Sequence, residues 1–410
     1  MKFTYRHTLH ASYLGYVTQA IINNLPPLLF VTFQREFTIS LEQIGLLISV
    51  NFGVQLLTDL VAVKLIDRIG YRVGIVCAHV LSFLGLVAFS VLPFVFSWGY
   101  TGLLISMTLC SIGGGLLEVL VSPIVEALPG EEKATAMSLL HSFYCWGQVA
   151  VVLLSTVFFL TAGVGKWYYL PVLWSILPLV NTFFFARVPL RSLVEDENRQ
   201  PLRQLFKRRL FWLFILLMVC AGSSELAMSQ WASLFAELGL GVSKFVGDLL
   251  GPCTFAIGMG LVRFLYGIKG SKLKLERMLV LSSILCIFSY LVTVFSPFPL
   301  LSLVGCATCG VSVAMLWPGT FSLTSRHFPR GGTAMFAVLA LAGDLGCSAG
   351  PGLVGYISNK VQKLASSQML PWIKDTTELG LKLGLLFTVI FPVVMFVGFS
   401  LLIKRNRAPV

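Results

Sequence analysis

The sequence predicts an all-α membrane protein with twelve transmembrane helices in two pseudo-symmetric six-helix bundles. Three observations predict this fold. First, 56% of the 410 residues are hydrophobic and only 12% are charged, which is more apolar surface than a soluble core of this length can bury. Second, the basic residues gather in alternate loops between apolar segments. Third, the two halves of the chain share short sequence features.

The apolar segments have the length that a membrane requires. A span needs about 20 apolar residues, so a chain of this length with short loops holds about twelve spans. The expected spans cover residues 9–33, 44–66, 73–96, 100–128, 134–160, 167–186, 211–238, 245–268, 278–295, 300–323, 333–357 and 381–403.

The distribution of Lys and Arg predicts the orientation of the chain. Most of them lie in one alternate set of loops, which includes both termini and the central loop 188–209. Because cytoplasmic loops carry an excess of Lys and Arg, we expect these parts in the cytoplasm and the spans in the cell (inner or plasma) membrane. The net charge of +12 reflects these loops, so we expect the lipid bilayer and no nucleic acid as a partner.

The charged, proline-containing segment 188–209 is the expected cytoplasmic linker between an N-terminal bundle, 1–187, and a C-terminal bundle, 210–410. Pro123 in the fourth span corresponds to Pro318 in the tenth span. The pair Ala136-Met137 corresponds to Ala334-Met335, just after the following loop. This is where two parallel six-span repeats would place matching residues, and such repeats hold a substrate site near the bilayer midplane.

Glu118 is the strongest candidate for a functional residue. It lies mid-span, with no charged residue within four positions on either side. A charge at the bilayer centre costs roughly 2.5–3.5 kcal/mol on insertion scales, so the carboxyl is expected to be protonated, paired or facing a wet cavity. Three preceding glycines allow a neighbouring helix to approach closely, and Ser122 shares the face of Glu118. The functional interpretation is a proton-binding or substrate-binding carboxyl; the alternative is a structural hydrogen bond to another helix.

Three amides lie in the first span, just before two consecutive prolines: Gln19, Asn23 and Asn24. Amides offer both donors and acceptors, which suits a hydroxyl-rich ligand. Hydrogen bonding between helices explains them equally well.

One face of the fifth span carries His141, Tyr144 and Gln148. His141 can change its charge near physiological pH or donate to a solute hydroxyl. The alternative is a histidine at a cavity edge that bonds a backbone carbonyl.

The second half contributes two acids and two tryptophans to the candidate site. Glu225 and Asp344 are intramembrane acids and, with Glu118, are the candidates for proton coupling. For Asp344 two roles stay open, in a gate or in the binding site. Trp231 and Trp317 could stack on a sugar face. The alternatives are an interfacial position for Trp231 and core packing for Trp317.

The loop after the second span carries a recognisable motif. Residues 64–72 read K-L-I-D-R-I-G-Y-R, which resembles the loop motif G-x-L-A-D-R-x-G-R-R of the major facilitator superfamily. The leading Gly and one Arg are replaced, and the D-R-x-G-x-R core is retained. We expect Asp67, Arg68 and Arg72, together with Asp59 in the preceding span, to form a cytoplasmic gate.

Spans four and five resemble one branch of that superfamily, the fucose-permease-like sugar:proton symporters. The matching residues are G-L-L-E at 115–118, S-P at 122–123, L-P-G-E at 128–131 and H-S-F-Y at 141–144. The resemblance implies a coupling carboxylate at Glu118 and polar sugar contacts in span five. The pattern of that family also has an acid in span one, where this chain has Asn. A coupling mechanism that needs one acid in span one and another in span four therefore does not carry over.

We therefore expect a secondary active transporter that takes up a sugar or other small polar solute with a proton by alternating access. We expect a monomer that uses no cofactor and no metal. The first alternative is a proton-coupled efflux carrier for amphipathic compounds, which the Phe and Met content permits. We do not expect an enzyme, because the sequence has no HExxH, Asp-rich cluster, Walker loop or Ser-centred elbow. A receptor that does not transport stays open.

Overall fold

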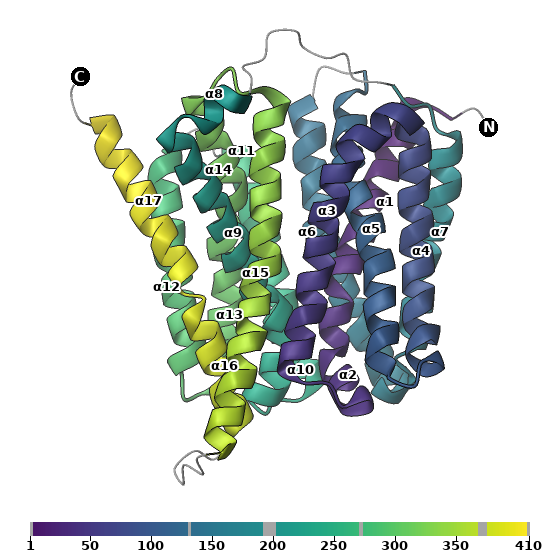
Figure 1. Cartoon of the computed structure of the whole chain (residues 1–410), viewed down its shortest axis with the longest axis vertical. Helices are drawn as coiled ribbons and strands as arrows, with labels where there is room; N and C mark the ends of the chain where they lie inside the picture. The colour runs from purple at the N-terminus through teal and green to yellow at the C-terminus, as the bar shows by residue number, and fades with distance from the viewer. Residues whose placement is uncertain (1–2, 130–132, 192–201, 270–273, 368–374, 408–410) are drawn as a thin grey trace. The chain divides into compact units, whose positions relative to one another are not determined.

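The computed structural model describes residues 3–129, 133–191, 202–269, 274–367 and 375–407. Within these residues every regular element is a helix (Figure 1). Eleven helical segments in this part of the chain are long and apolar enough to cross a membrane. The expected first span adds the twelfth, which is made of three consecutive helical pieces. The predicted all-α membrane fold is confirmed.

The chain divides into two compact units. The first unit comprises Met1–Ile39 and Val50–Glu195, and the second comprises Ser40–Ser49 and Asp196–Val410. The helices of the first unit are α1 (Tyr5–Asn24), η1 (Pro26–Leu29), α2 (Phe30–Phe37), α3 (Leu41–Ile69), α4 (Tyr71–Val95), α5 (Gly99–Glu126), α6 (Lys133–Ala162), η2 (Val164–Lys166) and α7 (Tyr169–Arg187). The start of α3 belongs to the second unit. Helix α1 packs against α5, α6 and α7, and α4 packs against α5 and α7.

The second unit contains the remaining helices. They are α8 (Leu202–Phe206), α9 (Arg209–Leu234), η3 (Phe235–Gly239), α10 (Lys244–Asp248), η4 (Leu249–Cys253), α11 (Thr254–Lys269), α12 (Leu275–Phe295), α13 (Pro299–Val313), α14 (Leu316–His327), α15 (Gly332–Ser367), α16 (Thr376–Phe387) and α17 (Ile390–Arg407). The segments η3 and η4 are π-helical turns. Helix α9 packs along α15, and α13 packs against α9, α11 and α12.

Prolines explain two breaks within the predicted spans. A proline has no N–H, and its ring clashes with the carbonyl four residues earlier. Helix α1 therefore ends at Asn24, and Pro26 and Pro27 open the short turn η1. In the second unit Pro318 lies four residues after Ala314, where the expected span 300–323 divides into α13 and α14.

The predicted linker 188–209 is only partly visible. Residues 192–201 lie outside the described part of the chain, and α8 with the start of α9 follows them. The expected bundle bounds stay a prediction, since the two compact units assign Ser40–Ser49 to the second one. Helix α15 reaches Ser367, ten residues beyond the expected end of its span at 357.

Small residues bring α9 and α15 close together in the second unit. A side-chain carbon added at Gly346 would collide with the carbonyl of Val219, and the Ser223 hydroxyl donates to the Gly346 carbonyl at 3.0 Å. Glycine at this position removes the side chain that would keep the two backbones apart. Close approach through small residues is a usual way for membrane helices to associate, because lipid provides no hydrophobic driving force.

The first residues of α3 are also held to α15 within the second unit. Ser49 and Ser348 each donate a hydroxyl hydrogen bond to the backbone carbonyl of the other, at 3.0 and 2.9 Å. The Asn359 amide donates to the Glu42 carboxylate at 2.6 Å. These bonds join segments that lie about three hundred residues apart in the sequence.

Candidate functional site

An amide network connects α1, α3 and α5 in the first unit. Gln19 donates to Gln55 at 2.8 Å. Gln55 donates to the side-chain oxygens of Asn23 and Asn51, each at 2.9 Å. Asn51 in turn donates to Asn23 at 3.0 Å, and the Ser111 hydroxyl donates to Asn51 at 2.8 Å. All five side chains are buried, so this network satisfies polar groups that would be costly in an apolar interior.

Glu118 lies at the edge of this network. The Gln19 amide nitrogen approaches one Glu118 carboxylate oxygen at 3.5 Å, the outer limit for a hydrogen bond. The side chain is half-buried. Among the described residues, no Lys, Arg or His forms an ion pair with Glu118. The side-chain oxygen of Gln19 is also buried and accepts no hydrogen bond from the described atoms. Gln19 can therefore accept one further hydrogen bond.

The glycine run before Glu118 has the packing role that the sequence predicted. A side-chain carbon at Gly114 would lie 3.1 Å from the Gln19 oxygen. One at Gly115 would lie 2.9 Å from the Gln55 carbonyl and 3.0 Å from the Asp59 carboxylate. The two glycines therefore leave the space in which α1 and α3 bring their polar side chains against α5.

A second polar group lies next to this network and joins α1, α5 and α6. The Tyr16 hydroxyl and the Ser122 hydroxyl are 2.8 Å apart. The Tyr16 ring meets His141 edge-on, with 5.3 Å between ring centroids. Asn24 donates to its own helix at Ala20 and approaches the Tyr144 hydroxyl at 3.5 Å. The structure thus gathers the predicted residues of spans one, four and five in one unit. Gln148, one further turn along α6, is buried.

Sequence reasoning missed four members of these groups: Tyr16, Asn51, Gln55 and Ser111. A signal was present for two of them, because Asn51 and Gln55 lie four residues apart in an apolar span and share a face with Asp59. Tyr16 similarly shares a face of α1 with Gln19. The hydroxyl of Ser111 had no such signal, since membrane helices often satisfy serine on their own backbone.

The predicted gate residues have different surroundings. Arg72 donates to the carbonyls of Phe185, Ala186 and Val188 at 2.9, 3.0 and 2.9 Å, so it binds the carboxyl end of α7, where carbonyls lack helical partners. Asp59 is buried beside the glycine run, and Arg68 is exposed. The side chain of Asp67 lies outside the described part of the chain. Their role as a gate stays a prediction.

The intramembrane acid of α9 has a basic partner. Arg263 of α11 lies 3.4 Å from the Glu225 carboxylate, and its Nε donates to the Ala314 carbonyl at 3.1 Å. That carbonyl is the one that Pro318 displaces from helical bonding. Arg263 therefore binds one charge and one backbone acceptor at the break between α13 and α14. The sequence signal was a lone arginine inside an apolar span, which marks a functional or structural charge by default.

The other predicted residues of the second unit are packed against α15 or belong to it. Trp231 is fully buried, and its ring nitrogen donates to the Pro351 carbonyl at 3.1 Å. The Trp317 ring lies against Gly343, where an added side-chain carbon would collide with it. Asp344, the next residue, is buried. These contacts give both tryptophans packing partners, and their binding role stays a prediction.

A second charged group lies between the two π-helical turns. Asp248 is buried, accepts a hydrogen bond from Ser233 at 2.5 Å and lies 3.1 Å from the Lys244 ammonium. Sequence reasoning did not single out either residue as part of a charged group. In the described part of the chain, no three His, Cys, Asp or Glu side chains are placed to hold a metal ion.

Comparison with known proteins now assigns the family. A family model described as Major Facilitator Superfamily matches residues 12–351. The chain belongs to this superfamily. It is similar to the L-fucose-proton symporter of Escherichia coli (strain K12), with 28% identity over 134 residues. That alignment covers 32% of this chain and 30% of the symporter, so it spans less than a third of this relative.

Solved structures of the superfamily have the same fold over nearly the whole chain. A bacterial homologue of the human lysosomal transporter Spinster, inward-facing and unoccupied, has a TM-score of 0.77 at 16% identity and 99% coverage of both chains. A D-xylose-proton symporter has a TM-score of 0.72 at 16% identity, covering 94% of this chain and 95% of its own. The E. coli fucose:proton symporter has a TM-score of 0.62 at 16% identity and 98% coverage of both. The protein is a multi-pass membrane transporter of this superfamily.

Proposed function

We propose that this chain is a proton-coupled transporter that takes up a sugar or other small polar solute by alternating access. The observation that carries the proposal is the position of Glu118 beside a neutral amide network, with no basic partner among the described residues. A neighbouring cation would hold a carboxylate in its charged form, whereas neutral amides leave it able to bind and release a proton. An intramembrane carboxyl of this kind suits a proton relay.

The surrounding groups support a hydroxyl-rich substrate. Amides and hydroxyls offer donors and acceptors in one place, which is the usual polar lining of a small-molecule site. The similarity to the L-fucose-proton symporter points to the same substrate class. Coupling follows if the solute binds best when Glu118 carries a proton, because each ligand then raises the affinity for the other. We place the protein in the cell membrane, with both termini in the cytoplasm.

The test is a pair of assays on the full chain in proteoliposomes, with radiolabelled L-fucose and D-xylose as the first probes. Glu118→Gln keeps the shape of the protonated side chain and cannot release a proton. We expect it to retain exchange of solute between equal pools and to lose accumulation driven by an imposed pH gradient. Glu118→Ala should also weaken exchange, since it removes any contact of this side chain with the solute.

Glu126→Gln is the matched control, because Glu126 is an exposed acid at the end of the same helix. It should accumulate solute as the wild-type chain does. Accumulation by Glu118→Gln at the wild-type rate would refute the proposal for Glu118 and make Glu225 or Asp344 the leading coupling residue. Proton-driven export of amphipathic compounds, with no solute uptake, would favour the efflux alternative.

A further inference from the structure

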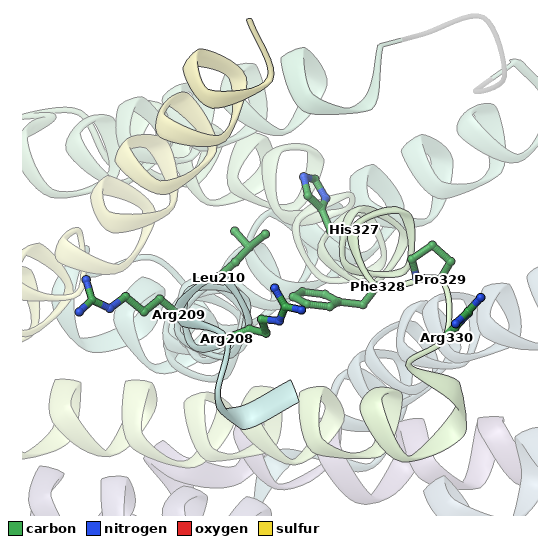
Figure 2. Close-up of a pocket in the computed structure, with 7 residues that line it drawn as sticks. All are labelled: Arg208, Arg209, Leu210, His327, Phe328, Pro329 and Arg330. Carbon is green, nitrogen blue, oxygen red and sulfur yellow. The ribbon is translucent and has the colours of Figure 1, made fainter. Parts of the chain in front are cut away.

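A basic pocket lies in the second unit, and none of the residues discussed above for transport lines it. It has a volume of about 580 Å³ and is formed by the start of α9 and the segment that follows α14 (Figure 2). Its lining includes Arg208, Arg209 and Arg330, and the aromatic side chains of His327 and Phe328. In Figure 2 the Arg208 side chain extends toward the Phe328 ring, and Arg209 and Arg330 extend to opposite sides.

Buried aromatic contacts fix the walls of this pocket. Phe211 and Phe214 of α9 are fully buried. Phe211 meets Phe328 edge-on at 5.7 Å between ring centroids, and Phe214 meets His327 at 5.4 Å. The segment after α14 is therefore packed onto α9, so the pocket is built into the unit and does not depend on the position of a single surface side chain.

The pocket lies at the ends of two membrane-spanning segments, where lipid headgroups are expected. One membrane-spanning segment begins at Arg209 and another ends at His327, so the lining residues flank the ends of two spans. Trp212, one turn into α9, is 54% exposed, and its ring nitrogen donates to the Phe206 carbonyl at 2.9 Å. Tryptophan is typical of the interface between the hydrocarbon and water. Leu216, one turn further, is also exposed and continues an apolar flank toward the bilayer centre.

Within the described residues, no acid is paired with the basic groups of the pocket. The three arginines are exposed, and none of their guanidinium groups forms an ion pair with an acid in the described part of the chain. Nearby Arg326, in contrast, lies 3.8 Å from the Glu276 carboxylate. Guanidinium groups match phosphate oxygens with paired hydrogen bonds, and the lining of this pocket offers Arg208 beside the Phe328 ring and Arg330 on the segment after α14.

We propose that this pocket binds the phosphate headgroup of an anionic phospholipid. The position at the span ends and the apolar flank favour a lipid over a soluble phosphate, because a lipid fills both the basic pocket and the neighbouring hydrocarbon-facing surface. Basic pockets at the ends of membrane helices bind anionic headgroups by this combination of charge and depth. The proposal is independent of the transported solute and of the residues that couple it to protons.

The test titrates the delipidated full chain in detergent with phosphatidylglycerol and with phosphatidylcholine, and counts bound lipids by native mass spectrometry. We expect the wild-type chain to prefer phosphatidylglycerol. The double variant Arg208→Gln/Arg330→Gln should weaken phosphatidylglycerol binding about 30-fold, since each basic residue near an anionic surface contributes about 1 kcal/mol. Phosphatidylcholine binding should not change.

A matched control removes the same charge elsewhere. Arg6→Gln/Arg187→Gln replaces two exposed arginines of the first unit and should bind phosphatidylglycerol within about twofold of wild type. Melting temperatures without lipid show whether each variant is folded. If the double variant of the pocket is not folded, the single variant Arg330→Gln replaces it in the test. Equal phosphatidylglycerol binding by the pocket variant and wild type would overturn the proposal. Displacement of the lipid by millimolar inorganic phosphate would also overturn it, in favour of a soluble phosphate ligand.

Discussion

Two intramembrane acids of this protein lie in opposite surroundings. Glu118 of α5 borders a network of neutral amides, and the Gln19 amide nitrogen lies 3.5 Å from one of its carboxylate oxygens. Glu225 of α9 lies 3.4 Å from the Arg263 guanidinium, which also binds the Ala314 carbonyl. Both side chains are half-buried within spans. The sequence shows two lone acids inside apolar spans, and the structure shows that their partners differ.

The difference predicts different roles. An acid paired with a cation loses a strong interaction if it takes up a proton, so Glu225 is suited to a fixed charge pair that holds α9, α11 and the α13–α14 break together. An acid among neutral amides breaks no ion pair when it takes up a proton. Glu118 is therefore the better candidate for a group that changes its charge in every transport cycle.

The largest expected effect comes from breaking the charge pair. Arg263→Gln should lower the free energy of unfolding by about 3 kcal/mol, since removing one partner of a poorly exposed ion pair leaves the other uncompensated. The side chains of Arg263 and Glu225 are 21% and 13% exposed, which keeps solvent from replacing the lost partner fully. Unfolding in one detergent at increasing denaturant or temperature measures the loss.

The double variant Glu225→Gln/Arg263→Gln should recover part of this stability, because no charge is then left alone. Glu118→Gln should change the free energy of unfolding by less than about 1 kcal/mol, since it strands no charge. The contrast between the two acids would be wrong if Glu118→Gln lowered the free energy of unfolding as much as Arg263→Gln does. It would also be wrong if the loss in the double variant equalled the sum of the losses in Glu225→Gln and Arg263→Gln.

An intermediate effect is expected at Gln55, the centre of the amide network. Gln55→Met keeps the length of the side chain and removes three hydrogen bonds. The side-chain oxygens of Asn23 and Asn51 each keep another hydrogen-bond donor. The main loss is therefore the acceptor of the 2.8 Å hydrogen bond that Gln19 donates. We expect a loss of about 2 kcal/mol in unfolding free energy, the cost of leaving buried polar groups unsatisfied.

The transport assay sharpens this prediction. In Gln55→Met the Gln19 amide has only Glu118 to bind, so the pH dependence of gradient-driven uptake should shift relative to wild type. Gln55→Glu keeps the oxygen that accepts from Gln19 and removes the donor to the two asparagines, which separates the two halves of the network. Unchanged stability in Gln55→Met would show that the amides contribute nothing to the packing of α1, α3 and α5.

Much of the fold and part of the site were predictable from particular residues. The lengths of the apolar segments predicted the spans, and the glycine run predicted the close packing around Glu118. The pairing of helices could not be predicted. Gln19 and Gln55 bond across 36 positions, and Tyr16 and Ser122 across 106, and no local pattern specifies which faces of two helices meet.

Charges inside spans were predictable only in part. Arg263 and Asp248 are ionisable residues inside an apolar segment, and such a position by itself indicates a functional or structural charge. The partner of Arg263 at Ala314 depends on the broken helix at Pro318, a feature that the proline suggests without placing the acceptor. The sequence therefore identifies the isolated charges, and only the fold identifies their partners.

The smallest expected effect tests how much a single bond between helices contributes to the neutral network. The single hydroxyl hydrogen of Ser111 is shared between the Asn51 oxygen of α3, at 2.8 Å, and the Met107 carbonyl of its own helix, at 2.6 Å. Ser106, also buried in α5, donates only to its own helix, to the Gly102 carbonyl at 2.7 Å. Ser→Ala at both positions removes the same atom, and the bond to the helix's own backbone contributes little to stability.

Ser111→Ala should therefore cost about 1 kcal/mol more in unfolding free energy than Ser106→Ala, because only Ser111 also bonds another helix. Equal losses in the two variants would mean that the contact between α3 and α5 rests on the glycine run alone.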